Sequence, residues 1–102
     1  MAVLALALVL TVSWTGSAWA ADGAAIFSAK CAQCHMGGKN VINPSKTLSL
    51  ADLTANGKDT VAAIVTQVTN GKAPMPAFKG ILKDDEITAV ATYVLEQAQA
   101  GW

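Results

Sequence analysis

Arginine is absent from the 102-residue chain, and charged residues of all types make up only 14% of it. Seven lysines balance seven acidic residues, so the net charge at pH 7 is zero. A nucleic-acid-binding protein needs a basic surplus for its phosphate contacts, and this balance argues against that class of partner. With 53% apolar residues, the chain is also too hydrophobic for intrinsic disorder. Its length allows one small domain.

Charge is missing altogether from the first 21 residues, and the apolar run Val3–Leu10 fills much of that segment. The triplet Ala18–Ala20 has the small-x-small pattern of a signal peptidase site, although no Lys or Arg precedes the apolar run. An uncleaved anchor is the alternative, because about 20 apolar residues can span a bilayer. We predict a signal peptide over residues 1–20 and an exported domain over residues 21–102 that does not span the membrane once processed.

Cysteine is scarce as well, since the chain has only Cys31 and Cys34. The 82 residues left after cleavage form a domain that buries little surface, and such small domains usually depend on disulfides, a metal or a cofactor. Two cysteines this close together cannot clamp distant parts of the fold. The composition therefore predicts another stabilising group.

Helical periodicity dominates the exported part, and no stretch alternates between apolar and polar residues over the length of a strand. The predicted fold class is all-α, with three or four helices. Two irregular stretches, residues 36–47 and the loop around Pro74 and Pro76, are long for so small a domain and could wrap a group that is not protein. The first two expected helices run from an Asp22 cap to about Cys31 and from a Ser49 cap over Leu50 to Ala55. The others run from an Asp59 cap through Val61, Ile64, Val65 and Val68 to Asn70-Gly71, and from Asp84 to about Gln99 with Ile87, Val90, Ala91, Val94 and Leu95 as an apolar stripe.

Cys31, Cys34 and His35 form the pattern C-x-x-C-H, which is typical of c-type haem attachment. On a helical turn, positions i, i+3 and i+4 share one face, so both thiols can reach the two vinyl groups while the imidazole faces the iron. Three alternatives compete with this interpretation. A disulfide between the two cysteines would close too short a loop to stabilise the fold much. A thioredoxin-like dithiol lacks its βαβ context, and a zinc site lacks a fourth ligand.

A second axial ligand has to come from the opposite face of the haem, far from His35 in the sequence. Met36 adjoins His35 and cannot reach across, and Met1 falls in the predicted signal peptide, which leaves Met75. A proline on each side fixes φ and stiffens the loop around this thioether. The alternative is that Met75 fills a gap in the core. As a ligand, its soft sulfur would favour ferrous iron and raise the reduction potential.

A family resemblance rests on the segments Cys31–Gly38, Asn43–Leu48, Gln67–Lys72, Met75–Phe78 and Ala91–Trp102. Together they closely resemble cytochrome c6, the luminal cytochrome of cyanobacteria and algae. The resemblance implies a small class I cytochrome c fold, with three to four helices around one covalently bound haem c. It implies an electron carrier, not an enzyme, between the cytochrome b6f complex and photosystem I, with a terminal oxidase as a further acceptor in cyanobacteria. We expect a monomer in the thylakoid lumen or the periplasm.

By position in this resemblance, Gln67 matches a glutamine whose amide lies near the haem and tunes its potential. A solvent-facing helix residue is the alternative interpretation of Gln67. Gly23 and Phe27 match contacts between the N-terminal helix and the last helix, beside Tyr93. The candidates for excluding water from the haem are the apolar residues Leu48, Leu53, Ile64, Val68 and Phe78.

One departure from the family concerns docking. Where the family commonly places an Arg that is implicated in docking to photosystem I, this chain has Ile81. A divergent c6-like carrier with another acceptor is therefore an alternative. Lys72, Lys79 and Lys83 flank the methionine loop and either steer a partner or are ordinary solvated side chains. Two rivals remain. One is an open-site haem sensor or peroxidase, in which the position assigned to Met75 would be vacant, and the other is a stapled domain without a cofactor.

Overall fold

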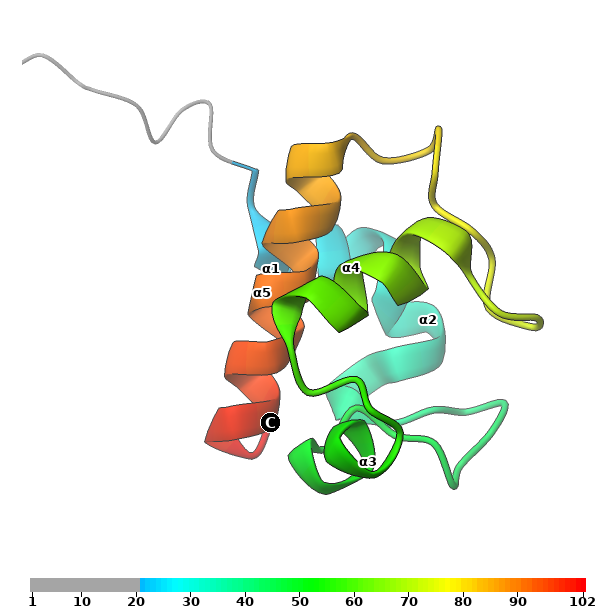
Figure 1. The fold of residues 1–102 in the computed structure, drawn as a ribbon, viewed down its shortest axis with the longest axis vertical. Helices are drawn as coiled ribbons and strands as arrows, with labels where there is room; N and C mark the ends of the chain where they lie inside the picture. Colours follow the sequence, from blue (N-terminus) through cyan, green and yellow to red (C-terminus); the bar gives the residue numbers. More distant parts are fainter. Residues whose placement is uncertain (1–20) are drawn as a thin grey trace, which may run out of the picture.

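The computed structural model describes residues 21–102, which fold into four helical bodies (Figure 1). Residues 21–102 contain isolated bridges but no strand, so the all-α prediction is confirmed. The predicted signal peptide, residues 1–20, lies outside the described part of the chain. The first body runs without a break through α1 (Gly23–Ile26), a π-helical segment η2 (Phe27–Cys31) and α2 (Ala32–His35), and ends in a 3-10 turn, η3 (Met36–Gly38). The other bodies are α3 (Leu50–Ala55), α4 (Val61–Asn70) and α5 (Asp84–Ala100).

Two of the three N-cap residues predicted from the sequence are confirmed. The side chains of Asp22 and Ser49 each accept a hydrogen bond, 3.2 Å long, from the main-chain N–H three residues on. The prediction of Asp59 as the cap of α4 is wrong. The hydroxyl of Thr60 accepts the hydrogen bond instead, from the N–H of Ala63 at 3.1 Å. Because α4 begins at Val61, Asp59 lies one residue too early to cap it.

The N-terminal helical body is longer than predicted, because helical backbone continues past Cys31 to His35. In η2 the N–H of Ala32 donates to the carbonyl of Phe27, five residues back, which widens the helix just before the last residues of the C-x-x-C-H motif. Single π-helical turns of this kind occur often at functional sites. The helix ends where Gly37 adopts a left-handed φ of 64°, a conformation that glycine takes without strain.

α5 is the central helix, and it packs against α1, α3 and α4. α1 crosses it at Gly23, where the main chain of Ala89 occupies the space that a Cβ would need. The ring of Phe27 lies 5.4 Å from the ring of Tyr93, centroid to centroid. The expected contact of these three positions between the first and last helices is therefore confirmed.

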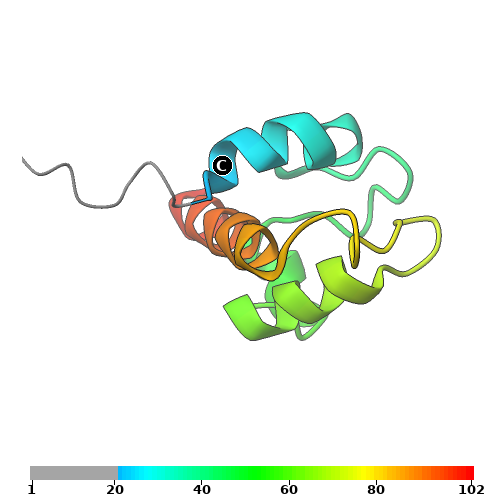
Figure 2. The same cartoon turned by 90° about the horizontal axis from the view of Figure 1, so that it is seen from above.

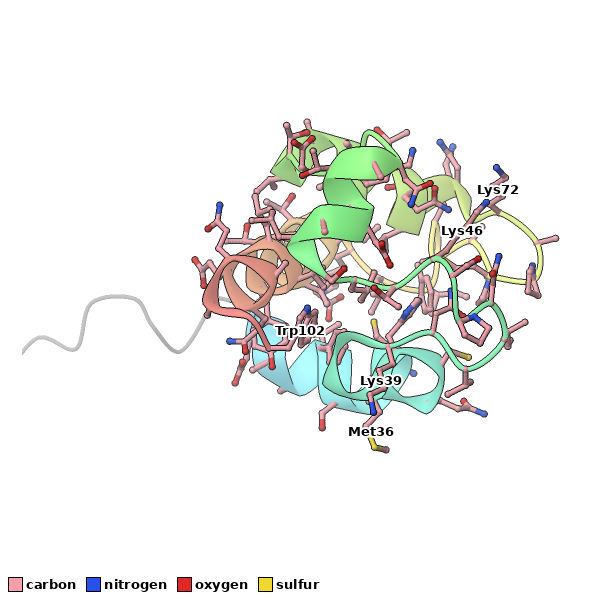
Figure 3. All side chains as sticks on the ribbon, turned by 90° about the horizontal axis from the view of Figure 1, so that it is seen from below. Met36, Lys39, Lys46, Lys72 and Trp102 are labelled. Carbon is pink, nitrogen blue, oxygen red and sulfur yellow. The ribbon has the colours of Figure 1, made fainter. Side chains whose placement is uncertain are left out.

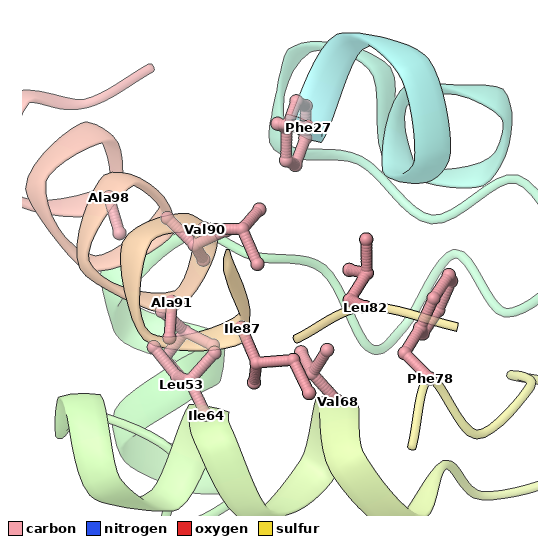
Figure 4. Close-up of a cluster of buried hydrophobic side chains, with 11 residues drawn as sticks. Phe27, Leu53, Ile64, Val68, Phe78, Leu82, Ile87, Val90, Ala91 and Ala98 are labelled. Atoms are coloured by element: carbon pink, nitrogen blue, oxygen red, sulfur yellow. The ribbon is translucent and has the colours of Figure 1, made fainter. Parts of the chain in front are cut away.

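The core is one apolar cluster to which each of the four helical bodies contributes at least one buried side chain (Figure 4). The predicted stripe of α5 is confirmed at four positions, whereas Leu95 is only half-buried and Ala98 is buried in addition. The buried members are Phe27, Leu53, Ile64, Val68, Phe78, Leu82, Ile87, Val90, Ala91, Val94 and Ala98.

Seen from above, the α1–α2 body and α4 extend from α5 in the same direction, and the long loops lie at their far ends (Figure 2). Both bodies pack on α5, one through α1 and the other through α4. Within residues 21–102, no helix has the length and apolar character needed to cross a membrane.

Candidate functional site

A cavity of about 600 Å³ lies between the α1–α2 body, α4 and the two long loops. This volume falls within the range of about 300–1,000 Å³ that is usual for small-molecule and cofactor sites. α5 contributes Val90 and Val94 to its wall. All of the apolar residues predicted to exclude water line the cavity, namely Leu48, Leu53, Ile64, Val68 and Phe78.

The C-x-x-C-H motif forms one wall, where Cys31, Cys34 and His35 line the cavity and are each half-buried. The helical backbone of η2 and α2 places these three side chains together, as the spacing predicts. His35 Nδ1 lies 2.9 Å from the carbonyl oxygen of Lys39. A carbonyl can only accept, so we assign the ring proton to Nδ1. The lone pair of Nε2 is then free to coordinate a metal.

The two thiols differ in their surroundings. Burial raises the pKa of the Cys31 thiol to about 11, because the apolar wall disfavours a thiolate. Neither Cys31 nor Cys34 is in a disulfide. A tetrahedral zinc site needs a fourth ligand, and among the described residues that line the cavity there is no further His or Cys beyond the three of the motif.

The methionine loop, residues 71–78, forms another part of the cavity wall. Lys72 and Met75 exchange main-chain hydrogen bonds of 3.1 and 2.8 Å, which closes a tight turn. The N–H of Phe78 donates to the carbonyl of Val68 at 2.9 Å and fastens the end of the loop to α4. At Gly71, with φ of 64°, a Cβ would lie about 2.6 Å from main-chain atoms of the returning loop. The loop is therefore held by backbone contacts at both ends.

Met75 lines the cavity and is half-buried, whereas Met36 is 69% exposed and does not line it. The amide Nε2 of Gln67 donates to Met75 Sδ at 3.8 Å, a distance typical of a weak hydrogen bond to sulfur. The solvent-facing alternative for Gln67 is thus disfavoured, because its side chain is directed toward Met75 and both residues line the cavity. This amide holds the thioether in place within the cavity that the C-x-x-C-H motif also lines.

The donor set fits a haem c. Two thiols and an imidazole with a free Nε2 stand on one wall, and a thioether stands on another wall of the same apolar cavity. A flat apolar macrocycle needs such walls, and its iron takes a nitrogen and a sulfur ligand from opposite faces. The structure thus brings together all five residues that the sequence singles out for this site.

Four lysines also line the cavity and give its rim a positive charge: Lys30, Lys46, Lys58 and Lys72. Figure 3 shows two of them, Lys46 and Lys72, on the side of the molecule away from α5. Of the three lysines singled out in the sequence, only Lys72 reaches the cavity. The other three members of the rim come from three different segments, so no local pattern in the sequence groups them.

Asp52 is the one acidic side chain among the residues that line the cavity. The hydroxyl and the N–H of Thr47 both donate to its carboxylate, and these hydrogen bonds lower the pKa of Asp52. The carboxylate therefore stays ionised and fastens the loop before α3. Its charge only partly offsets that of the four lysines.

Known proteins similar to this chain are cytochromes. A family model described as cytochrome c oxidase, cbb3-type, subunit III, matches residues 18–94. Cytochrome c6 of Rippkaea orientalis is 64% identical over 83 residues, which cover 81% of this chain and 75% of that protein. Cytochrome c6 of Microcystis aeruginosa is 64% identical over 81 residues, which cover 79% of this chain and all of that protein.

Solved structures agree with the sequence comparisons. Cytochrome c6 from the diatom Phaeodactylum tricornutum matches with a TM-score of 0.75 and 54% identity, over 78% of this chain and 94% of the other. Cytochrome c6C from Synechococcus sp. PCC 7002 matches with a TM-score of 0.77 and 44% identity, over 78% and 98% of the two chains. The chain therefore belongs to the cytochrome c6 family, the haem-containing c-type cytochromes of photosynthetic electron transport.

Proposed function

We propose that residues 21–102 form a single-haem electron carrier in which Cys31 and Cys34 attach haem c through thioethers, and His35 and Met75 are the axial ligands. The observation that carries this proposal is the placement of these four side chains around one apolar cavity of about 600 Å³. The bound haem supplies a one-electron Fe(II)/Fe(III) couple. Membership of the family supports the general function of a haem c electron carrier. The proposal adds which residues of this chain bind the haem.

The side chains around the cavity have separate tasks in this proposal. The carbonyl of Lys39 holds the His35 ring so that Nε2 faces the iron position. The amide of Gln67 withdraws electron density from the sulfur of Met75, which favours the ferrous state. The apolar walls exclude water from the cavity, and His35 and Met75 together would leave a bound haem no open position for a substrate.

We further propose that the carrier accepts electrons from the cytochrome b6f complex and passes them to photosystem I, with a terminal oxidase as another acceptor. This assignment rests on the family resemblance and implies export, with residues 1–20 removed, to the thylakoid lumen or the periplasm. The lysine rim supports brief, electrostatically guided encounters with an acidic partner surface. A monomer suits such encounters.

The ligand proposal is tested on protein purified from a host that attaches haem c. The expected spectrum is six-coordinate and low-spin, with poor uptake of carbon monoxide by the ferrous form. Met75→Ala is expected to lower the reduction potential and to admit carbon monoxide. Met36→Ala is the matched control, because Met36 is 69% exposed and lies outside the cavity.

Three results would contradict the ligand proposal. Ready binding of carbon monoxide by the unmutated ferrous protein would favour the open-site sensor or peroxidase. An unchanged spectrum in Met75→Ala would remove that residue from the iron. A colourless protein with free thiols would leave only a cofactor-free domain.

The acceptor is tested by the kinetics of electron transfer to photosystem I. Ile81 is 60% exposed at the position where the resemblance leads us to expect an arginine. Ile81→Arg is expected to speed the reaction at low ionic strength. Gln99→Arg, at an exposed position of α5 outside the cavity lining, is the control that adds the same charge. If both variants behave alike, or neither reacts with photosystem I, the divergent carrier with another acceptor is the better assignment.

A further inference from the structure

Trp102 lies against the loop that follows the C-x-x-C-H motif. α5 ends in a Schellman motif, with Gly101 at φ of 86° and the N–H of Trp102 donating to the carbonyl of Gln97 at 2.8 Å. This turn directs the indole back across the fold, where it is half-buried. Its ring centroid lies 5.3 Å from that of Phe27 and 6.3 Å from that of Tyr93, edge to face in the second case.

The indole packs closely on Gly38, the last residue of η3. Gly38 is buried with φ of 79°, and three ring carbons of Trp102 lie 2.5 Å from where a Cβ would stand. Only a residue without a side chain allows this approach. Figure 3 shows Trp102 between α5 and the segment that carries Lys39.

Trp102 also fastens the other end of the same loop. Its Nε1–H donates to the carbonyl of Leu48 at 2.8 Å, across 54 residues of sequence. The N–H of Leu48 in turn donates to the carbonyl of Gly38 at 2.8 Å. The indole thus contacts both ends of the loop 38–48 and closes it.

Lys39 is the first residue of this loop after Gly38, and its main-chain carbonyl accepts a hydrogen bond from His35 Nδ1 at 2.9 Å. Gly38, on which the indole rests, directly precedes Lys39. We propose that Trp102 is a positioning residue for His35, acting through the loop 38–48 to keep the Lys39 carbonyl on the imidazole. It acts on His35 through this loop and not as a ligand. The role rests on the proposed function of His35 as the axial ligand.

The alternative is that Trp102 only adds apolar contacts to the core. The two roles differ in what the His35 ring proton experiences. If Trp102 positions His35, loss of the indole N–H loosens the loop 38–48, and the hydrogen bond between His35 Nδ1 and Lys39 opens more often. The rate at which the Nδ1 proton exchanges with solvent then rises. A packing role changes only the global stability, which any core variant of similar cost reproduces.

The experiment uses the ferrous holoprotein and follows exchange of the His35 Nδ1 proton by nuclear magnetic resonance. Trp102→Phe keeps an aromatic ring but loses the N–H donor, and we expect about fivefold faster exchange, the effect of one net hydrogen bond. Trp102→Ala is expected to give a larger increase. Leu95→Ala, a half-buried position of α5 outside the cavity lining, and Lys39→Ala, which keeps the main-chain carbonyl, are expected to match the unmutated protein.

A low-spin haem spectrum combined with unchanged exchange in Trp102→Phe would overturn the positioning role while leaving the proposed function intact. An equal rise in Leu95→Ala would also overturn it, because global stability would then explain the effect. The proposed function fails on a different readout, namely the lack of a haem spectrum in the unmutated protein. If Trp102→Ala does not fold, Trp102→Phe decides the question.

Discussion

A pair of glycine substitutions measures how much the contact between Trp102 and Gly38 contributes to stability. Gly38 and Gly57 both have φ in the left-handed region, at 79° and 67°. Alanine at either position costs about 1–2 kcal/mol from the backbone alone. At Gly57 nothing lies within 4 Å of the place a Cβ would take, whereas at Gly38 the indole of Trp102 fills it. Gly38→Ala and Gly57→Ala therefore carry a similar backbone strain, and only Gly38→Ala also disturbs the contact with Trp102.

Gly38→Ala has to displace Trp102. The displaced indole loses its hydrogen bond to Leu48, worth about 1 kcal/mol net. It also loses its ring contacts with Phe27 and Tyr93, worth about 0.5–1.5 kcal/mol each. Gly38→Ala is therefore expected to reduce the free energy of unfolding by about 2–4 kcal/mol more than Gly57→Ala does.

Urea unfolding of the holoprotein, followed by far-ultraviolet circular dichroism, gives both free energies. Trp102 is the single tryptophan of residues 21–102, so the near-ultraviolet dichroism of its indole reports the displacement directly. That signal is expected to weaken in Gly38→Ala and to persist in Gly57→Ala. Equal losses of stability, with the indole signal intact in both variants, would refute the reasoning.

Three further predictions concern the core, the potential and the pH dependence. Ile87→Ala, at a side chain that is 2% exposed, should lower the free energy of unfolding by about 2–5 kcal/mol in urea titrations. Gln67→Leu should lower the reduction potential in redox titration, because Met75 loses the amide that withdraws density from its sulfur. The pKa of Asp52 is lowered in the fold by Thr47, so the stability it supplies is present above the pKa of the unfolded chain and is lost as pH falls through the folded value. Asp52→Asn should therefore flatten the fall of stability in acid, measured by urea unfolding across that pH range.

Local signals in the sequence predict the helices well, and they also single out residues that the structure places around one cavity. The Asp22 and Ser49 caps and the apolar stripe of α5 depend on neighbours within a few residues, and the structure has them. The adjacent Asp59 and Thr60 both suit an N-cap, and only the observed start of α4 at Val61 decides between them. A one-residue ambiguity of this kind is beyond a propensity argument.

Features that depend on distant contacts are not predictable from local pattern. The hydrogen bond from Trp102 to Leu48 joins residues 54 apart, and the lysine rim gathers side chains from separate loops and helices. The π-helical turn that ends at Cys31 also has no marker in the sequence, because its residues suit an α-helix equally well. These features follow from how the bodies pack on α5.

His35 lies in the body that packs on the 17-residue α5 through α1, and the methionine loop follows α4, which packs on the same helix. One rigid element thus anchors both walls, which limits changes in the spacing between the imidazole and the thioether. In the proposed site, an iron held by His35 and Met75 at a nearly fixed spacing would change its bond lengths little between oxidation states. We therefore expect fast electron self-exchange between reduced and oxidised molecules.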